Sequence, residues 1–455
     1  MKQVDKLTLR IQGTLTRQHV QQTDPLYFDV PEGITQLNIV IRYHPRFEPG
    51  QPFPHQISMM IFDPTGPRCE ISRPTDEGIV MNEAYASPGG TPGPIQPGRW
   101  RMFVLAHRLM TSGSVDYEIE VGMTTDPITI APRSLSPGRV APRGPGWYRG
   151  DLHAHTIHSD GSWDIPELAQ FMRDRGADFM TLSDHNTISG LMEVRSLADD
   201  GLLTIGGMEL SPYFGHSLAL GIANWFDWRT IDGQQISMPE LTQTVLASDA
   251  FYVIAHPMAV GEPECCGCRW LYTDMMPGNA PAVEIWNGYW ADYNEDSLRL
   301  YYSWLNQGHR LVATCGTDIH GRPPTDETGR AAFNVVYAQL FSERGILEAL
   351  KLGHSYISAG PELILAARST SGAEAMAGDA LSADAATVTV KLNGAHPGDV
   401  LSFIVDGEVR AAQAVLESGE VLWTLAARSA HWCTVELRDS LGDMWAISNP
   451  IYFGR

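Results

Sequence analysis

Strand-like and helix-like segments alternate between residues 148 and 360, and this alternation constrains the fold more than any other feature of the chain. The strand-like segments are 147–155, 178–185, 203–210, 217–223, 251–257, 282–288 and 310–318, and the helix-like segments are 165–176, 189–199, 238–248, 294–308 and 343–353. Short connections in such a pattern are typical of a parallel α/β arrangement. Seven or so strands in a segment of this length favour a closed barrel over an open sheet.

The segments on either side of this region are β-rich. Residues 1–147 contain short alternating runs separated by Gly/Pro turns, which predicts an N-terminal β-sandwich domain. A Pro-, Gly- and Arg-rich stretch from Ala131 to Gly150 marks the boundary with the central domain, residues 148–360. Residues 361–455 again read as strands and turns, which predicts a C-terminal immunoglobulin-like β-domain.

Charge and composition exclude several classes of function. The net charge is −21, and a protein that binds a nucleic-acid polymer needs basic patches instead. The N-terminal residues contain no apolar run typical of a signal peptide, and no later stretch is long enough to span a membrane. Six cysteines in 455 residues are too few for a disulfide framework. We therefore expect a cytoplasmic protein with no membrane partner.

Residues that can bind metal ions lie where the central strands end. In a parallel barrel, the active site is formed at these carboxyl ends. Six strand ends carry His, Asp or Glu, a pattern that purely structural roles explain poorly. The candidate metal ligands are His153, His155, Asp160, His185, Glu209, His216, His256, Asp318 and His320.

The motifs that contain these residues resemble those of a known enzyme family. DLHAHTIHSDG, LSDHN, GMELS, IAHP and GTDIH occur in the order and spacing of the PHP (polymerase and histidinol phosphatase) family of metal-dependent hydrolases. The resemblance covers residues 150–360 and implies a distorted (β/α)7 TIM-like barrel with two or three metal ions. The flanking β-domains and the SNPIYF ending are similar to the carbaryl-hydrolase-like branch of that family.

The resemblance also implies a role for each ligand. His153, His155, Glu209 and Asp318 would bind the first ion, and Asp160, His185 and the bridging Glu209 would bind the second. His216, His256 and His320 would bind a third. Asp318 and His320 are also candidates for proton transfer to the leaving group, and Arg322 for clamping an anionic substrate. The mixed His and carboxylate ligands suit Mn, Fe or Zn without selecting one.

Other polar residues near the ligands have weaker assignments. Asp184 could orient an imidazole, whereas His158 is expected to be exposed or hydrogen-bonded rather than a ligand. Arg269 and Arg330 are lesser candidates for anion binding. Cys265, Cys266 and Cys268 are expected to form a reduced loop, with a soft-metal site as the alternative. His19, His44, His55 and His107 are isolated in the sequence and are expected to have only surface or core roles.

Aromatic residues near the strand ends leave the substrate class open. The residues near these ends are Tyr213, Trp270, Trp286, Asn287, Tyr289 and Trp290. The aromatic ones among them could form an apolar pocket or simply pack in the core. We predict a hydrolase that uses a metal-bridging hydroxide, with a phosphomonoester or phosphodiester as substrate. The alternatives are a carbamate or carboxylic ester hydrolase acting on aryl esters, and a non-catalytic metal-stabilised binding protein. The expected partner is a small anionic or aryl-ester substrate, and the flanking β-domains could support a homo-oligomer.

Overall fold

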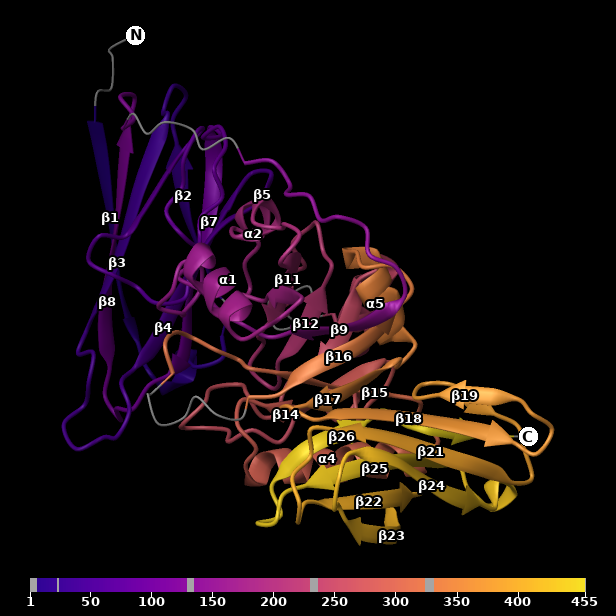
Figure 1. Ribbon diagram of the computed structural model, residues 1–455. Helices are drawn as coiled ribbons and strands as arrows, with labels where there is room; N and C mark the ends of the chain where they lie inside the picture. Colours follow the sequence, from indigo (N-terminus) through magenta and orange to yellow (C-terminus); the bar gives the residue numbers. More distant parts are fainter. Residues whose placement is uncertain (1–5, 23, 129–134, 230–235, 324–330, 455) are drawn as a thin grey trace.

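The chain folds into three β-rich parts that follow one another along the sequence. The computed structural model describes residues 6–22, 24–128, 135–229, 236–323 and 331–454. Figure 1 shows the N-terminal sheets in indigo and violet, a central α/β unit in magenta and orange, and a C-terminal pair of sheets in orange and yellow. The expected α/β class therefore holds for the central unit, and strands outnumber helices in the molecule as a whole.

Two antiparallel sheets form the N-terminal sandwich. One contains β1 (Lys6–Leu15), β8 (Val115–Thr124), β3 (Gln36–His44) and β6 (Ile79–Asn82), and the other contains β2 (Pro25–Val30), β7 (Gly98–Arg108), β4 (Gln56–Asp63) and β5 (Gly66–Ile71). Alternating apolar residues from both sheets, among them Leu37, Met59 and Trp100, fill the space between them.

The central sheet is mixed rather than all-parallel. Its strands follow the order β15 (Val312–Gly316), β14 (Ala282–Asn287), β13 (Phe251–Ile254), β12 (Ser217–Leu220), β11 (Leu203–Leu210), β10 (Phe179–Leu182), β9 (Gly146–Asp151), β16 (Phe333–Ala338) and β17 (Ser355–Ser358). β12 is antiparallel to both neighbours, and β16 is antiparallel to β9 and β17. Only residues 211–216 connect β11 to β12, and so short a link cannot make the crossover that a parallel pair needs.

The expected closed barrel is not confirmed. Within the described residues no backbone ladder joins β15 to β16. Instead the side chain of Asn334 spans the gap: its Oδ1 accepts from the Cys315 amide at 3.1 Å, and its Nδ2 donates to the Cys315 carbonyl at 2.7 Å. A buried amide side chain thus satisfies part of the edge of β15, and Asn449 Oδ1, which accepts from the Ala313 amide at 2.8 Å, satisfies another part.

Five α-helices in the described residues match the helix-like segments of the sequence. They are α1 (Ile165–Asp174), α2 (Leu191–Ser196), α3 (Met238–Ala247), α4 (Asp292–Asn306) and α5 (Glu343–Lys351). The N-cap of α1 is Asp164, whose carboxylate accepts from the Glu167 amide at 2.8 Å while Glu167 Oε2 accepts from the Asp164 amide at 3.0 Å. This capping box, with Pro166 in the first turn, begins the helix immediately after the DLHAHTIHSDG loop. None of the described helices is long and apolar enough to cross a membrane.

The C-terminal part is a second pair of facing sheets. One contains β19 (Glu374–Met376), β18 (Glu362–Ser369), β21 (Ala386–Asn393) and β24 (Gly419–Leu425). The other contains β26 (Met444–Ser448), β25 (Trp432–Arg438), β22 (Val400–Val405) and β23 (Glu408–Ala414), with β20 (Ala380–Leu381) and β27 (Ile451–Phe453) at its margin. Because β26 also pairs with β17, this sheet continues the central one. The immunoglobulin-like assignment stays a prediction.

The N-terminal sandwich packs directly against the central unit. Phe62 and Phe103 of the sandwich belong to the same apolar cluster as Trp228 and Trp286 of the central unit. Arg108, at the end of β7, donates hydrogen bonds to the carbonyl oxygens of Pro263 and Glu264. These contacts hold the sandwich over the loops that follow the central strands.

Candidate metal centre

The nine candidate ligands converge in one place. His153 and His155 follow β9, His185 follows β10, His256 follows β13, and Asp318 follows β15, while Glu209 lies near the end of β11. Groups of three or four of the nine side chains have their donor atoms within 4.8 Å of one another. The carboxyl ends of the strands thus gather donors that are up to 167 positions apart in the sequence, from His153 to His320.

Glu209 lies at the middle of this cluster. Its Oε2 atom is 3.3 Å from His153 Nε2, 3.3 Å from His155 Nε2 and 2.9 Å from His185 Nδ1. Its Oε1 atom is 3.1 Å from His216 Nδ1 and 3.2 Å from His256 Nε2. One buried carboxylate therefore faces five imidazoles, with a different group of histidines on each oxygen.

Two further carboxylates complete the donor set. Asp318 Oδ1 lies 2.9 Å from His155 Nε2 and 3.3 Å from His153 Nε2. Asp160 Oδ1 lies 3.1 Å from His320 Nε2 and 3.6 Å from His185 Nε2. His320 therefore groups with Asp160. The sequence resemblance implied a group of His216, His256 and His320. None of the donor groups in the described residues brings His320 together with His216 or His256.

The buried donors titrate as a coupled set. Burial alone would raise the pKa of Glu209, but His185 and His153 hold it well below its usual value. Burial alone would lower the pKa of His185, but Glu209 and Asp160 raise it to about 10. Burial, together with His320 and His185, lowers the pKa of His155 to about 4. The site therefore keeps its carboxylates ionised while its imidazoles differ widely in basicity.

The donors fit a metal cluster. His153 Nε2, both ring nitrogens of His155, and Glu209 Oε2 are buried and have no hydrogen-bond partner among the described residues. Unpaired buried polar atoms are costly unless something else satisfies them, and divalent ions do so with this mixture of imidazole and carboxylate. His256 (φ 25°) and Asp318 (φ 50°) also have positive φ angles, a strain that often occurs at functional sites.

Glu284 is a supporting residue that the sequence did not reveal. It is buried in β14, and its Oε1 lies 3.1 Å from His153 Nδ1. Its Oε2 accepts from the His256 backbone amide at 3.0 Å and from Asn287 Nδ2 at 3.1 Å. A carboxylate on the outer nitrogen of an imidazole fixes the tautomer that presents the other nitrogen to an ion. The only sequence signal was a charged residue inside an apolar strand.

Asp184 has a different role from the one expected. Rather than orienting an imidazole, its carboxylate accepts from the Thr156 amide and hydroxyl, both at 2.7 Å, and from the Ser159 hydroxyl at 2.6 Å. Asp184 thereby fixes the loop that presents Asp160. His158, as expected, is outside the donor groups, and its Nδ1 is 2.8 Å from Ser189 Oγ.

The candidate arginines are not inside the cluster. Arg322 is exposed and lines a neighbouring hollow together with Tyr289 and Tyr293. Asp318 and His320 line the same hollow. Arg269 is exposed, and Arg330 lies outside the described residues. A cation from the sandwich contacts a candidate ligand instead: Arg73 Nη2 lies 3.5 Å from Asp160 Oδ2.

The cysteine loop differs from the expected reduced loop. Cys265 and Cys268 form a disulfide, because a tight turn brings their Cα atoms to 5.6 Å, within the range that such a bond needs. Both sulfurs are therefore unavailable as thiolate ligands while the disulfide is formed, and Cys266 is a free thiol. The Cys268 carbonyl lies 3.2 Å from His256 Nδ1, so the loop helps to orient a candidate ligand.

A cavity of about 580 Å³ opens onto the cluster, and the sandwich forms part of its wall. Asp160, His185, His216, His256, Asp318 and His320 line it on one side. His55, Ser58, Glu70, Arg73 and His107 line it from the sandwich. The surface or core roles expected for His55 and His107 did not place either residue near the site, but the packing of the sandwich on the central unit brings both into the wall. Neither belongs to a donor group among the described residues.

The aromatic candidates separate into two groups. Tyr213 lines the cavity and Tyr289 the neighbouring hollow, whereas Trp270 and Trp286 are buried in the core. The metal-site cavity therefore receives one aromatic side chain from the set singled out in the sequence, and Tyr43 and Phe47 from the sandwich.

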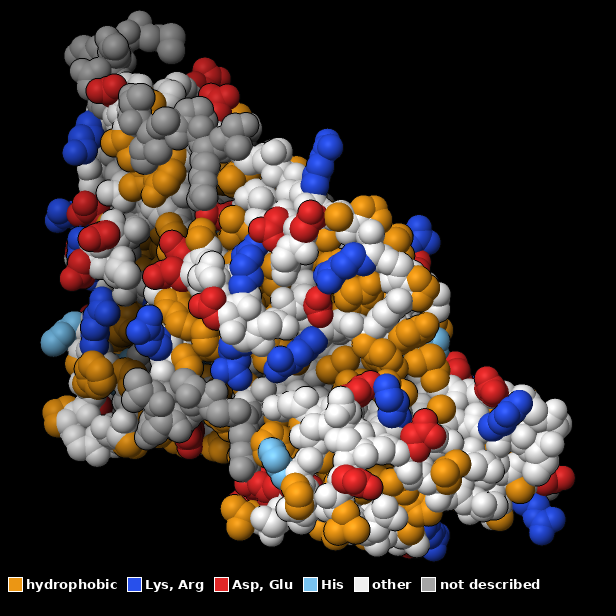
Figure 2. All heavy atoms as spheres, viewed as in Figure 1, with side chains coloured by type: hydrophobic (Ala, Val, Ile, Leu, Met, Phe, Trp, Pro, Cys, Tyr) orange, Lys and Arg blue, Asp and Glu red, His pale blue; other side chains and the backbone are white. Residues whose placement is uncertain are grey.

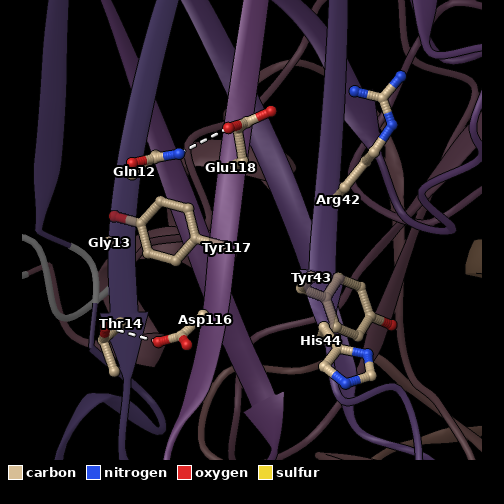
Figure 3. Close-up of a pocket in the computed structure, with 9 residues that line it drawn as sticks. All are labelled: Gln12, Gly13, Thr14, Arg42, Tyr43, His44, Asp116, Tyr117 and Glu118. Atoms are coloured by element: carbon tan, nitrogen blue, oxygen red, sulfur yellow. Dashed lines mark hydrogen bonds between the residues drawn. The ribbon is translucent and has the colours of Figure 1, made fainter.

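A second hollow lies on the open face of the sheet β1–β8–β3 (Figure 3). Its polar side chains pair with one another: Gln12 Nε2 donates to Glu118 at 2.7 Å, and Thr14 Oγ1 donates to Asp116 at 2.8 Å. None of the donor groups in the described residues includes them. Figure 2 shows acidic and basic side chains interspersed over the visible surface, without a broad basic patch.

Comparison with known proteins gives short or distant similarities. No family model matches the chain. It is 34% identical over 64 residues, 14% of its length, to a phosphoribosyl 1,2-cyclic phosphate 1,2-diphosphodiesterase of Eggerthella lenta, and it spans only 24% of that relative. A two-domain protein of Bacteroides vulgatus, described as containing a predicted PHP-like metal-dependent phosphoesterase, is similar with a TM-score of 0.40 and 14% identity, covering 70% of this chain and 98% of that one. An amidohydrolase of Chromobacterium violaceum is similar with a TM-score of 0.28 and 17% identity, covering 39% and 89% of the two chains.

Proposed function

We propose that the protein is a metal-dependent hydrolase of the PHP type that cleaves a phosphomonoester or phosphodiester. The observation that carries the proposal is the position of Glu209, whose two carboxylate oxygens each face a separate group of histidines within 3.3 Å. A carboxylate so placed suits the bridging ligand of a multi-metal centre. The short match to a curated phosphodiesterase supports the phosphoester as substrate.

We assign the ions to three groups of residues. His153, His155, Glu209 and Asp318 would hold the first, and Asp160, His185 and Glu209 would hold the second, with His320 added to this group by its position beside Asp160. His216 and His256 would contribute to a third through Glu209. The central unit would then be the distorted barrel of this family, with Asn334 closing the seam between β15 and β16.

When bound, such ions lower the pKa of water toward 7 and stabilise negative charge on a transferring phosphoryl group. The residues of the chain orient the ligands, exclude water and transfer a proton. Glu209 and Glu284 orient the imidazoles, and burial of His153 and His155 excludes bulk water from behind them. Of the donors on the open side, His320 has 34% of its side-chain surface exposed, against 23% for Asp318, 22% for Asp160 and 19% for His185, and so is placed to pass a proton to the departing oxygen. Burial alone would raise the pKa of Asp318, but His153 holds it well below its usual value, so this carboxylate can accept a proton rather than donate one.

An aryl carbamate or carboxylic ester is the second candidate substrate. Its support is the aromatic lining of the cavity by Tyr43, Phe47 and Tyr213. Against it stands the polar character of the rest of the lining, where Arg73 of the sandwich lies beside Asp160 and could neutralise an anion.

A substrate panel separates the candidates. Protein loaded with Mn, Fe or Zn is assayed with 4-nitrophenyl phosphate, bis(4-nitrophenyl) phosphate and 1-naphthyl N-methylcarbamate, with the Glu209→Ala variant as the blank. We expect metal-dependent release of 4-nitrophenol from at least one phosphoester, and none with Glu209→Ala. Turnover of the carbamate alone would overturn the phosphoesterase proposal.

A further inference from the structure

A polar chain of three residues crosses the sandwich wall of the cavity. Ser58 Oγ, on β4, lies 2.8 Å from His107 Nε2, on β7. The same hydroxyl interacts with the buried carboxyl group of Glu70, on β5. Glu70 is only 4% exposed, and its Oε2 atom has no hydrogen-bond partner among the described residues. All three residues line the cavity that contains the candidate metal ligands.

A β-bulge explains why His107 reaches this wall. Ile57 pairs with Ala106, and the preceding residue, Gln56, pairs with Arg108, so His107 is the extra residue on β7. Bulges are enriched next to active sites because they redirect a side chain that the regular alternation would place elsewhere. Arg108 fixes this end of β7, since it donates to the Pro54 carbonyl at 3.0 Å as well as to the loop of the central unit.

The contact with Ser58 determines which His107 nitrogen can bond to a ligand in the cavity. Ser58 Oγ lies 2.8 Å from His107 Nε2, so this nitrogen already has a partner. Nδ1 is then the ring nitrogen that is available to a ligand. Burial, together with His216 and His185, lowers the pKa of His107 to about 4, which favours the neutral ring.

We propose that His107 of the N-terminal sandwich binds the organic part of the substrate through a hydrogen bond made by Nδ1, and so determines which phosphoester the site accepts. This inference rests on the proposed function, because it places the phosphoryl group at the metal ligands and the rest of the substrate against the sandwich. Ser58 acts as a positioning residue that sets the orientation of the ring.

Kinetics on variants of the full-length, metal-loaded protein test the proposal with 4-nitrophenyl phosphate as substrate and inorganic phosphate as inhibitor. We expect His107→Phe to raise KM about five- to tenfold, the value of one neutral hydrogen bond, with a smaller effect on kcat. The inhibition constant of inorganic phosphate, which has no organic part, should stay within twofold of the wild-type value. Bound metal and thermal stability should be unchanged.

Substitutions that keep one nitrogen position sharpen the test. Asparagine places its amide near the Nδ1 position of histidine and glutamine near Nε2, so His107→Asn should retain most of the affinity and His107→Gln should behave like His107→Phe. Ser58→Ala should also raise KM, because it removes the partner that orients the His107 ring. His44→Asn, an exposed histidine of the same sandwich, is the matched control.

Several outcomes would overturn the proposal. An unchanged KM in His107→Phe would show that the residue does not contact the substrate. A parallel rise in the inhibition constant of phosphate would place His107 at the phosphoryl group instead of the organic part. Equal losses in His107→Asn and His107→Gln would contradict the Nδ1 assignment. If wild-type protein hydrolyses no phosphoester, the proposed function itself fails, a result distinct from all three.

Discussion

At the scale of single residues, the cluster around Glu209 stores protons that metal ions must displace. The pKa of His185 is raised from 6.5 to about 10, since the neighbouring carboxylates outweigh the effect of burial. His185 is therefore protonated at pH 7 in the metal-free protein, and only its neutral form can bind an ion. Apparent metal affinity should rise with pH up to about 10 and level off above it.

Calorimetry measures this displacement directly. We expect binding of Zn²⁺ or Mn²⁺ at pH 7 to release about one proton or more per chain. The observed enthalpy should then differ between two buffers of different ionisation enthalpy. His185→Ala should reduce the proton count, whereas the exposed His44→Asn should not. Equal enthalpies in both buffers would show that His185 is already neutral.

Glu284 offers a second prediction at this scale. Glu284→Gln keeps the size of the side chain but removes the charge that fixes His153, so metal affinity should fall about 10- to 100-fold. The measurement is a competition titration with a chelator of known affinity, and the exposed Glu77→Gln is the control for loss of one negative charge. An affinity within twofold of wild type would remove Glu284 from the site.

At the scale of elements, the side chain of Asn334 bridges β15 and β16. Asn334→Ala leaves both the amide and the carbonyl of Cys315 without their buried partner. Each such group costs about 1–3 kcal/mol, so the free energy of unfolding should fall by at least this much. Urea denaturation measures the loss. Asn393→Ala, at the exposed end of β21, should cost less than about 0.5 kcal/mol, and a similar cost for both variants would contradict this role of the seam.

Some of these elements could be predicted from the sequence, and others could not. The pattern of apolar residues located the helices, because this pattern is a local signal. In the structure, capping boxes at Asp164 and Ser237 begin two of them. Polar residues at strand ends pointed to the nine side chains that the structure brings together. The direction of β12 and the seam at Asn334 could not be predicted, since both depend on tertiary pairing. The bulge at His107 is likewise a property of strand register, which alternation along one strand does not reveal.

At the scale of the whole molecule, the N-terminal sandwich is part of the site as well as a neighbour of it. Its residues Phe62 and Phe103 lie in the core cluster of the central unit, with ring centroids 5.6 Å apart. The sequence analysis placed this segment in a separate domain because the contact joins positions more than 100 residues apart, such as Phe62 and Trp225.

This shared core gives a prediction for the stability of the molecule and for substrate binding. Phe103→Ala should lower the free energy of unfolding by about 3–5 kcal/mol, because it leaves a cavity in the buried interface. It should also weaken phosphate-ester binding, since the wall that contains His107 loses its support. Denaturation and KM are measured together, with Leu7→Ala on the exposed sheet face as control. A loss of stability with unchanged KM would show that the wall is held by the sandwich alone.

The central claim is that Glu209 bridges metal ions, and metal content measures it most directly. Purified protein is loaded with Mn, Fe or Zn, freed of excess ions, and analysed by elemental mass spectrometry alongside Glu209→Gln. We predict two or three ions per wild-type chain and at most one in the variant. Less than one ion per wild-type chain with every metal, or an unchanged content in Glu209→Gln, would contradict the account.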